Sequence, residues 1–181
     1  VGGQGIGVLS EVLIRAYNDA GYSAAGVDTH GLAQRGGMVE SHLRIGAGSG
    51  NPLVEEGHAD IALCLERTEA YRVLDGYLKS GGSLIYYDTS WQSLAVRLGS
   101  EQEITAEDVR VKAEGQDIQV YRVFSEKLKD ARMQNIGLIT GALEENLLEG
   151  LRKVNIENAL KLLFTGRVLE DNLEILEYTR R

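Results

Sequence analysis

The chain has 181 residues, 43% of them hydrophobic and 25% charged, which is typical of one globular domain with a sizeable core and excludes a disordered tail. Its formal charge of −8, from 19 basic and 27 acidic residues, argues against a nucleic-acid partner. No apolar run approaches the roughly 20 residues that span a bilayer, and no signal-peptide pattern opens the chain, so we expect a soluble, cytoplasmic protein without a membrane partner.

The first segment, VGGQGIG at residues 1–7, combines a glycine-rich loop with the start of a predicted helix. Apolar residues recur every three or four positions from Ile6 to Ala20, and Gly21 follows as the stop. Glycines allow positive backbone torsions and a close backbone approach, and a helix N-terminus attracts anions. The candidate ligand- or partner-binding residues of this loop are Gly2, Gly3, Gln4, Gly5 and Gly7. Because such a loop normally follows a strand, we expect a first strand upstream of residue 1.

Two interpretations of this glycine loop stay open. The dinucleotide fingerprint needs glycines at relative positions one, three and six, and Val8 occupies the sixth position counted from Gly3. Asp28 follows at about the distance of the usual ribose-binding acid, which keeps dinucleotide binding in consideration. The alternative is a tight turn from strand to helix.

A second loop, THGLAQRGG at residues 29–37, lies between the predicted strands YSAAGVD and MVESHLRIG. An imidazole, an amide, a guanidinium and a glycine pair in one loop suit an anion, a carbonyl group or a partner subunit. The candidate residues are His30, Gln34, Arg35, Gly36 and Gly37. The alternative is a surface turn in which the glycines merely reverse the chain.

The strand after this loop alternates, with Glu40, His42 and Arg44 on one face. We expect this face to be exposed to solvent or to contact a partner, so that His42 and Arg44 add to the candidate binding surface of the loop. In the simpler alternative, Glu40 neutralises Arg44.

Strand and helix signals alternate through the rest of the chain. ADIALCLE predicts a buried strand, and a helix is predicted from about Arg67 to Lys79. SGGSLIYYDTS and DIQVYRVF predict further strands, while residues 125–151 and 155–181 are predicted to be mostly helical. Strands separated by helices indicate an α/β fold of three layers, with a mostly parallel sheet, helices on both faces and a Rossmann-like glycine loop at the N-terminus. With no repeat and one proline, Pro52, we expect a single domain over residues 1–181.

The sequence offers few ligands for a cofactor. The only cysteine, Cys64, is interpreted as a buried strand residue, and one cysteine excludes both an internal disulfide and an iron–sulfur cluster held by this chain alone, because such clusters take about four thiolates. The histidines are His30, His42 and His58, without the close helical pairing of a zinc hydrolase. We therefore expect no metal and no cofactor bound by this chain alone.

Two motifs together, VGGQGIG and HGLAQRGGMVESHLRIG, resemble the gamma subunit family of 2-oxoacid ferredoxin oxidoreductases, and more specifically its indolepyruvate branch, in which the corresponding chain is the beta subunit. The resemblance continues through NPLVEEGHADIALCLERTEAYR, NIGLITGAL and TGRVLEDNLEILE, and so covers nearly the whole chain. The segment YDTSWQSL departs from the pattern of many relatives, which leaves the identity of the 2-oxo acid open.

The resemblance implies a role within a complex. Its catalytic subunits bind thiamine diphosphate, Mg²⁺ and iron–sulfur clusters, and the complex decarboxylates a 2-oxo acid oxidatively, forms an acyl-coenzyme A and reduces ferredoxin. This chain would dock on those subunits through HGLAQRGG, with contact to coenzyme A left open, and would be inactive alone. The alternatives are a stand-alone dinucleotide-binding oxidoreductase and an assembly module without a ligand.

Overall fold

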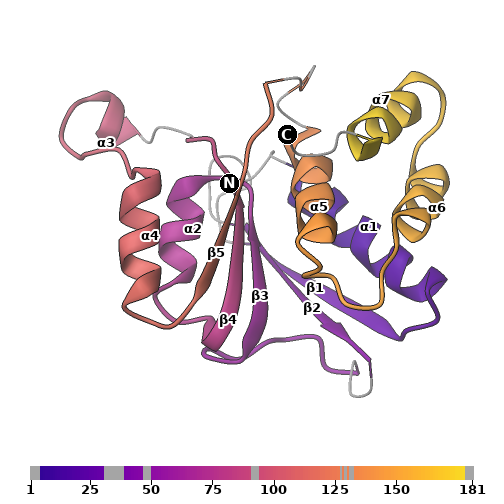
Figure 1. Ribbon diagram of the computed structural model, residues 1–181, viewed down its shortest axis with the longest axis horizontal. Coiled ribbons are helices and arrows are strands. Elements are labelled where there is room, and N and C mark those ends of the chain that lie inside the picture. Colours follow the sequence, from indigo (N-terminus) through magenta and orange to yellow (C-terminus); the bar gives the residue numbers. More distant parts are fainter. Residues whose placement is uncertain are drawn as a thin grey trace. The chain divides into compact units, whose positions relative to one another are not determined.

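The structure is a computed structural model that describes residues 5–30, 39–46, 50–90, 94–126, 128, 130 and 133–177 (Figure 1). The chain divides into two compact units, the first formed by Val1–Val54 with Glu126–Arg181 and the second by Glu55–Ser125. Within the described ranges, no helix is both long enough and apolar enough to cross a membrane. The predicted α/β class, with parallel strands flanked by helices, is confirmed.

The first helix in the described part of this unit is α1 (Ile6–Asp19), which confirms the helix predicted from its apolar periodicity. Strands β1 (Ala24–His30) and β2 (Val39–Ile45) follow and pair in antiparallel register. The connection between them, residues 31–38, is shorter than the crossover of at least about ten residues that a parallel pair needs, so the antiparallel pairing follows from its length. Helix α1 packs on this hairpin so closely that a Cβ on Gly26 would lie 2.8 Å from Ile14 Cδ1.

Three more helices belong to the described part of this unit: α5 (Gln134–Glu144), α6 (Lys153–Leu163) and α7 (Gly166–Glu177). Helix α1 contacts α5 and α6, and α7 contacts the same two helices. Near the C-terminus of α1, the Asp19 carboxylate accepts hydrogen bonds from Asn155 (2.8 Å) and Asn158 (3.1 Å) of α6. These bonds lower the pKa of Asp19.

The second unit contains a parallel sheet in the order β3 (Ala59–Cys64), β4 (Leu78–Tyr87) and β5 (Gln119–Val123). Helices α2 (Arg67–Val73) and α4 (Ala106–Glu114) lie side by side along one face of this sheet in Figure 1, and α3 (Leu94–Arg97) precedes α4. The core between them includes Leu84, Tyr86 and Val109, together with Cys64, whose predicted burial is confirmed.

Two helices in the second unit differ from the prediction. Helix α2 ends at Val73 rather than near Lys79, because Leu78 already pairs with Ala59 of the neighbouring strand. Helix α4 was not predicted, although Thr105 and Asp108 carry a local signal for it. The Thr105 hydroxyl accepts a hydrogen bond from the Asp108 N–H (3.1 Å), and the Asp108 carboxylate accepts one from the Thr105 N–H (2.8 Å). This reciprocal pair is a capping box, which starts a helix.

Candidate functional site

The residues that flank the two candidate loops lie next to one another in the first unit. Gly5 is the N-cap of α1, and its φ of 83° lies in the left-handed region that favours glycine. In the first turn of α1, a Cβ on Gly7 would lie 3.9 Å from the Asp28 carboxylate of β1. Because β1 ends two residues later at His30, the start of α1 and the end of β1 are adjacent. The two sequence motifs therefore meet at one place in the fold.

Asp28 is engaged with the hairpin itself. The Ser41 hydroxyl donates a hydrogen bond of 2.6 Å to Asp28 Oδ1 across the directly paired positions of β1 and β2. One position further, the Thr29 hydroxyl donates to the Glu40 carbonyl oxygen at 3.3 Å. The N-terminus of a helix favours a negative charge nearby. The Asp28 carboxylate thus lies near the start of α1, where a helix can otherwise bind an anion.

Asn135 brings a third motif, NIGLITGAL, to the same place. This side chain is 4% exposed and lies in the first turn of α5. Its Nδ2 donates to the Gly5 carbonyl oxygen at 3.3 Å, and its Oδ1 accepts the N–H of Ile136 at 2.8 Å. Asn135 therefore ties the glycine loop to a helix that lies about 130 residues further along the chain. It was not among the predicted site residues, and its only sequence signal is an amide at the start of an apolar run.

The described ranges include some of the predicted site residues. Gly5 and Gly7 are placed as above, and the backbone of His30 pairs with Val39. The others lie outside the described residues, and their roles stay predictions: Gly2, Gly3, Gln4, Gln34, Arg35, Gly36 and Gly37.

The predicted wet face of β2 is instead covered in part by residues 51–54. His42 is 8% exposed, and its Nδ1 accepts a hydrogen bond from the Val54 N–H at 3.2 Å. Arg44 remains exposed but donates from Nη2 to the Leu53 carbonyl oxygen at 2.8 Å. Glu40 Oε2 lies 3.8 Å from His42 Nε2, and the alternative in which Glu40 neutralises Arg44 does not occur among the described residues. The expectation that His42 extends a partner-facing surface was therefore wrong, because alternation along a strand cannot reveal what covers its outer face.

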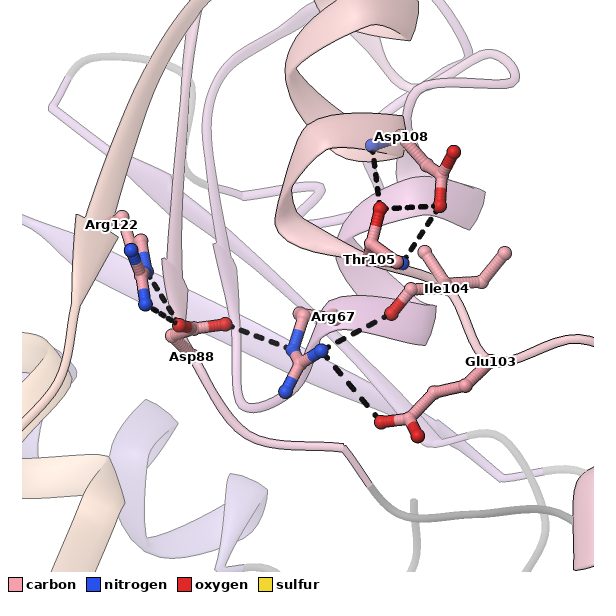
Figure 2. Close-up of polar contacts among 7 residues, drawn as sticks. All are labelled: Arg67, Asp88, Glu103, Ile104, Thr105, Asp108 and Arg122. Carbon is pink, nitrogen blue, oxygen red and sulfur yellow. Dashed lines mark hydrogen bonds and ion pairs between the residues drawn. The ribbon is translucent and has the colours of Figure 1, made fainter.

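The second unit has a charged network where the carboxyl ends of its parallel strands lie (Figure 2). Asp88 follows β4 directly and is 8% exposed. Its Oδ1 lies 2.8 Å from Arg67 Nε, and its Oδ2 accepts hydrogen bonds from the guanidinium of Arg122 on β5. In Figure 2, Arg67 also reaches the segment before α4, where its Nη1 lies 3.4 Å from the Ile104 carbonyl oxygen and 3.7 Å from Glu103 Oε1.

This network is balanced in charge, with two guanidinium groups facing two carboxylates. Ligands of open α/β sheets bind outside the carboxyl ends of the strands, which makes the position suggestive. The cations already have partners, however, and the contact of Asp88 Oδ1 with Arg67 Nε is a close ion pair outside hydrogen-bond geometry. Burial, and then the Asp88 charge, raises the pKa of the neighbouring Tyr86 hydroxyl. We interpret the network as structural, joining the strand ends to the start of α4.

Within the part of the chain that the structure describes, no three His, Cys, Asp or Glu side chains are grouped to hold a metal ion.

Comparisons with known proteins give a consistent result. The profile of the family described as pyruvate ferredoxin/flavodoxin oxidoreductase matches residues 1–181. Indolepyruvate oxidoreductase subunit IorB of Archaeoglobus fulgidus is 49% identical over 72 residues, which are 40% of this chain and 35% of that protein. The IorB subunit of Thermococcus kodakarensis is 42% identical over 82 residues, which are 45% of this chain and 40% of that protein. The aligned region therefore spans well under half the length of these curated relatives.

Solved structures extend the likeness over nearly the whole chain. The gamma subunit of a keto/oxoacid ferredoxin oxidoreductase from Geobacter sulfurreducens superposes with a TM-score of 0.64 at 17% identity, covering 98% of this chain and 90% of that one. The 2-oxoglutarate:ferredoxin oxidoreductase of Magnetococcus marinus, solved with 2-oxoglutarate, coenzyme A and succinyl-CoA, gives 0.66 at 20% identity, covering 97% of this chain and 28% of that one. At these identities the likeness shows the fold alone.

Proposed function

The chain belongs to the pyruvate ferredoxin/flavodoxin oxidoreductase family, and on this basis we propose that it is the gamma-type component of a 2-oxoacid:ferredoxin oxidoreductase complex. The proposed complex decarboxylates a 2-oxo acid oxidatively, transfers the acyl group to coenzyme A and passes the electrons to ferredoxin. The observation that carries the proposal is the family match over all 181 residues. The IorB relatives make indolepyruvate the first 2-oxo acid to test.

In this proposal the chain docks on catalytic subunits and holds no cofactor of its own. Thiamine diphosphate, Mg²⁺ and the iron–sulfur clusters bind to the partner subunits, since a chain with one cysteine lacks the thiolates that such a cluster needs. The isolated chain is then colourless and inactive. A cytoplasmic location belongs to the same proposal, because a single cysteine is consistent with a protein that needs no disulfide.

The geometry supports a single contact region built from both loops. The start of α1 and the end of β1 are adjacent, and Asn135 fixes the glycine loop to α5. A partner that meets the flank of one loop therefore also meets the flank of the other. Arg35 is the only charged residue between His30 and Glu40, so the group expected to bind there is a carboxylate of a partner subunit or a phosphate of coenzyme A.

The test is reconstitution of the complex with the variants Arg35→Lys and His30→Ala, measuring subunit affinity and 2-oxo acid turnover separately. Lysine keeps the charge of Arg35 but loses its planar fork, so a bidentate contact should weaken by about 1–3 kcal/mol. Arg110→Lys on the exposed face of α4 is the matched control and should leave both quantities unchanged. Normal affinity and normal turnover for both loop variants would refute the docking role of this loop.

The isolated chain provides a second, independent test. Co-purification with catalytic subunits supports the proposal, whereas iron–sulfur absorbance in a monodisperse sample of the chain alone contradicts it. Measurable binding of NAD or FAD by the isolated chain would favour the alternative of a stand-alone dinucleotide-binding oxidoreductase.

A further inference from the structure

Asn135 carries a buried amide that joins two distant parts of the first unit. The residue is 4% exposed and lies in the first turn of α5. Its Oδ1 accepts the N–H of Ile136 at 2.8 Å, and its Nδ2 donates to the Gly5 carbonyl oxygen at 3.3 Å. One end of the amide therefore serves α5, whereas the other end serves the start of α1.

The Gly5 carbonyl oxygen has a backbone partner besides Asn135. It accepts the N–H of Leu9 at 3.0 Å, which is the first backbone bond of α1. The bond from Asn135 adds a restraint on the direction of the Gly5 peptide group. Gly5 has φ of 83°, and glycine populates positive and negative φ about equally, so its own backbone preference does little to hold this conformation. Asn135 therefore restricts the glycine loop where it enters α1.

We propose that Asn135 is a positioning residue, which holds the start of α1 in the conformation that a partner subunit binds. This inference rests on the proposed docking function and adds to it a residue outside both loops. The start of α1 is adjacent to β1, since a Cβ on Gly7 would lie 3.9 Å from the Asp28 carboxylate. Restricting Gly5 thus also restricts how the flanks of the two loops meet. A segment that is ordered before binding loses less conformational entropy on binding, so the affinity is higher.

Two substitutions of Asn135 separate the two bonds of its amide. Asn135→Ala removes both bonds. Asn135→Asp has nearly the same shape and keeps an oxygen that can accept the N–H of Ile136, but it places a second oxygen where the donor to Gly5 lies. If the bond to Gly5 positions the start of α1, both variants should bind the partner more weakly. If Asn135 serves α5 alone, the aspartate variant should bind normally.

Asn172 provides a matched control in the same unit. It is 6% exposed, and its Nδ2 donates to the Val168 carbonyl oxygen at 2.7 Å, four residues earlier on α7. It is therefore a buried amide whose printed side-chain bond stays within its own helix. Asn172→Ala and Asn135→Ala should both lower the unfolding midpoint, because each removes a buried hydrogen bond. Only Asn135→Ala should weaken assembly.

The test is the affinity of each chain for the catalytic subunits that co-purify with the wild-type chain, measured by titration calorimetry beside the unfolding midpoint of the isolated chain. We expect the Kd to rise about three- to tenfold for both Asn135 variants, the effect of losing one hydrogen bond, and to stay unchanged for Asn172→Ala. An unchanged Kd for Asn135→Asp, or an equal rise for Asn172→Ala, would overturn the inference alone. Failure of the wild-type chain to bind any catalytic subunit would refute the docking function itself, and this inference with it.

Discussion

Asp88 should be the residue whose loss most weakens the charged network of the second unit. Its side chain is 7% exposed, whereas the side chains of Arg67 and Arg122 are 23% and 60% exposed. Breaking a fully buried ion pair costs about 3–5 kcal/mol, and an exposed pair contributes about 0–1 kcal/mol. Because Arg122 can turn to solvent and Arg67 retains the Ile104 carbonyl oxygen, we expect Asp88→Ala to lower the free energy of unfolding by about 2–3 kcal/mol.

The matched control is Asp60→Ala in the same unit. Asp60 pairs with Lys79 at 2.5 Å, but the two side chains are 76% and 50% exposed. Solvent screens such a pair, so its loss should cost less than about 0.5 kcal/mol. Urea unfolding followed by circular dichroism gives both values, provided that the dependence on denaturant concentration is the same for each variant. Equal losses for the two variants would show that burial does not set the strength of the Asp88 contacts, and the reasoning would fail.

Three further substitutions test other contacts through the same free energy of unfolding. Gly150→Ala should cost about 1–3 kcal/mol, because φ is 81° and the new Cβ, 2.4 Å from the Tyr22 hydroxyl oxygen, would displace that exposed ring; an unchanged unfolding midpoint would contradict this strain. Asn135→Ala should cost about 1–2 kcal/mol, because the buried Ile136 N–H loses its side-chain acceptor, while the Gly5 carbonyl oxygen keeps the N–H of Leu9. Thr105→Ala should cost about 1 kcal/mol at neutral pH. Hydrogen bonds from Thr105 lower the pKa of Asp108 in the folded protein. The stability that the Asp108 carboxylate gains from these bonds is therefore complete above the ordinary pKa of aspartate, about 4, and is lost as the pH falls through the lower pKa of the folded state. The difference in free energy of unfolding between wild type and Thr105→Ala should accordingly become smaller in acid.

The sequence predicted a helix correctly where neighbouring residues alone determine its start and end. Apolar spacing and Gly21 were sufficient for α1, because a helix buries a stripe of its own side chains and ends where glycine adopts φ of 88°. The end of α2 was missed because pairing of Leu78 with Ala59, a contact between distant parts of the sequence, decides it. Helix α4 is a different case, since the spacing of Thr105 and Asp108 is a local start signal that the sequence itself carries.

The candidate site was only partly predictable for the same reason. The glycine loop and the Asp28 region each carry a recognisable composition, but their adjacency depends on how α1 packs on the hairpin. Asn135 joins them through a bond that spans about 130 residues, and no spacing rule connects such positions. His42 was assigned to the correct face of β2, yet its burial depends on residues 51–54, which bond to that face.

The hydrogen bonds at the flanks of the two loops make it possible to tell whether Arg35 contacts a partner or stabilises its own loop. Asn135 bonds to the carbonyl oxygen of Gly5, and Ser41 bonds to Asp28, so described residues outside the two loops hold both flanks. Arg35→Lys should therefore leave the free energy of unfolding within about 0.5 kcal/mol of wild type while it weakens assembly. Urea unfolding of the isolated chain, set beside subunit affinity in the reconstituted complex, measures the two effects independently. A loss of stability as large as the loss of affinity would mean that Arg35 holds the loop in place, and that the proposed contact with a partner does not explain its presence.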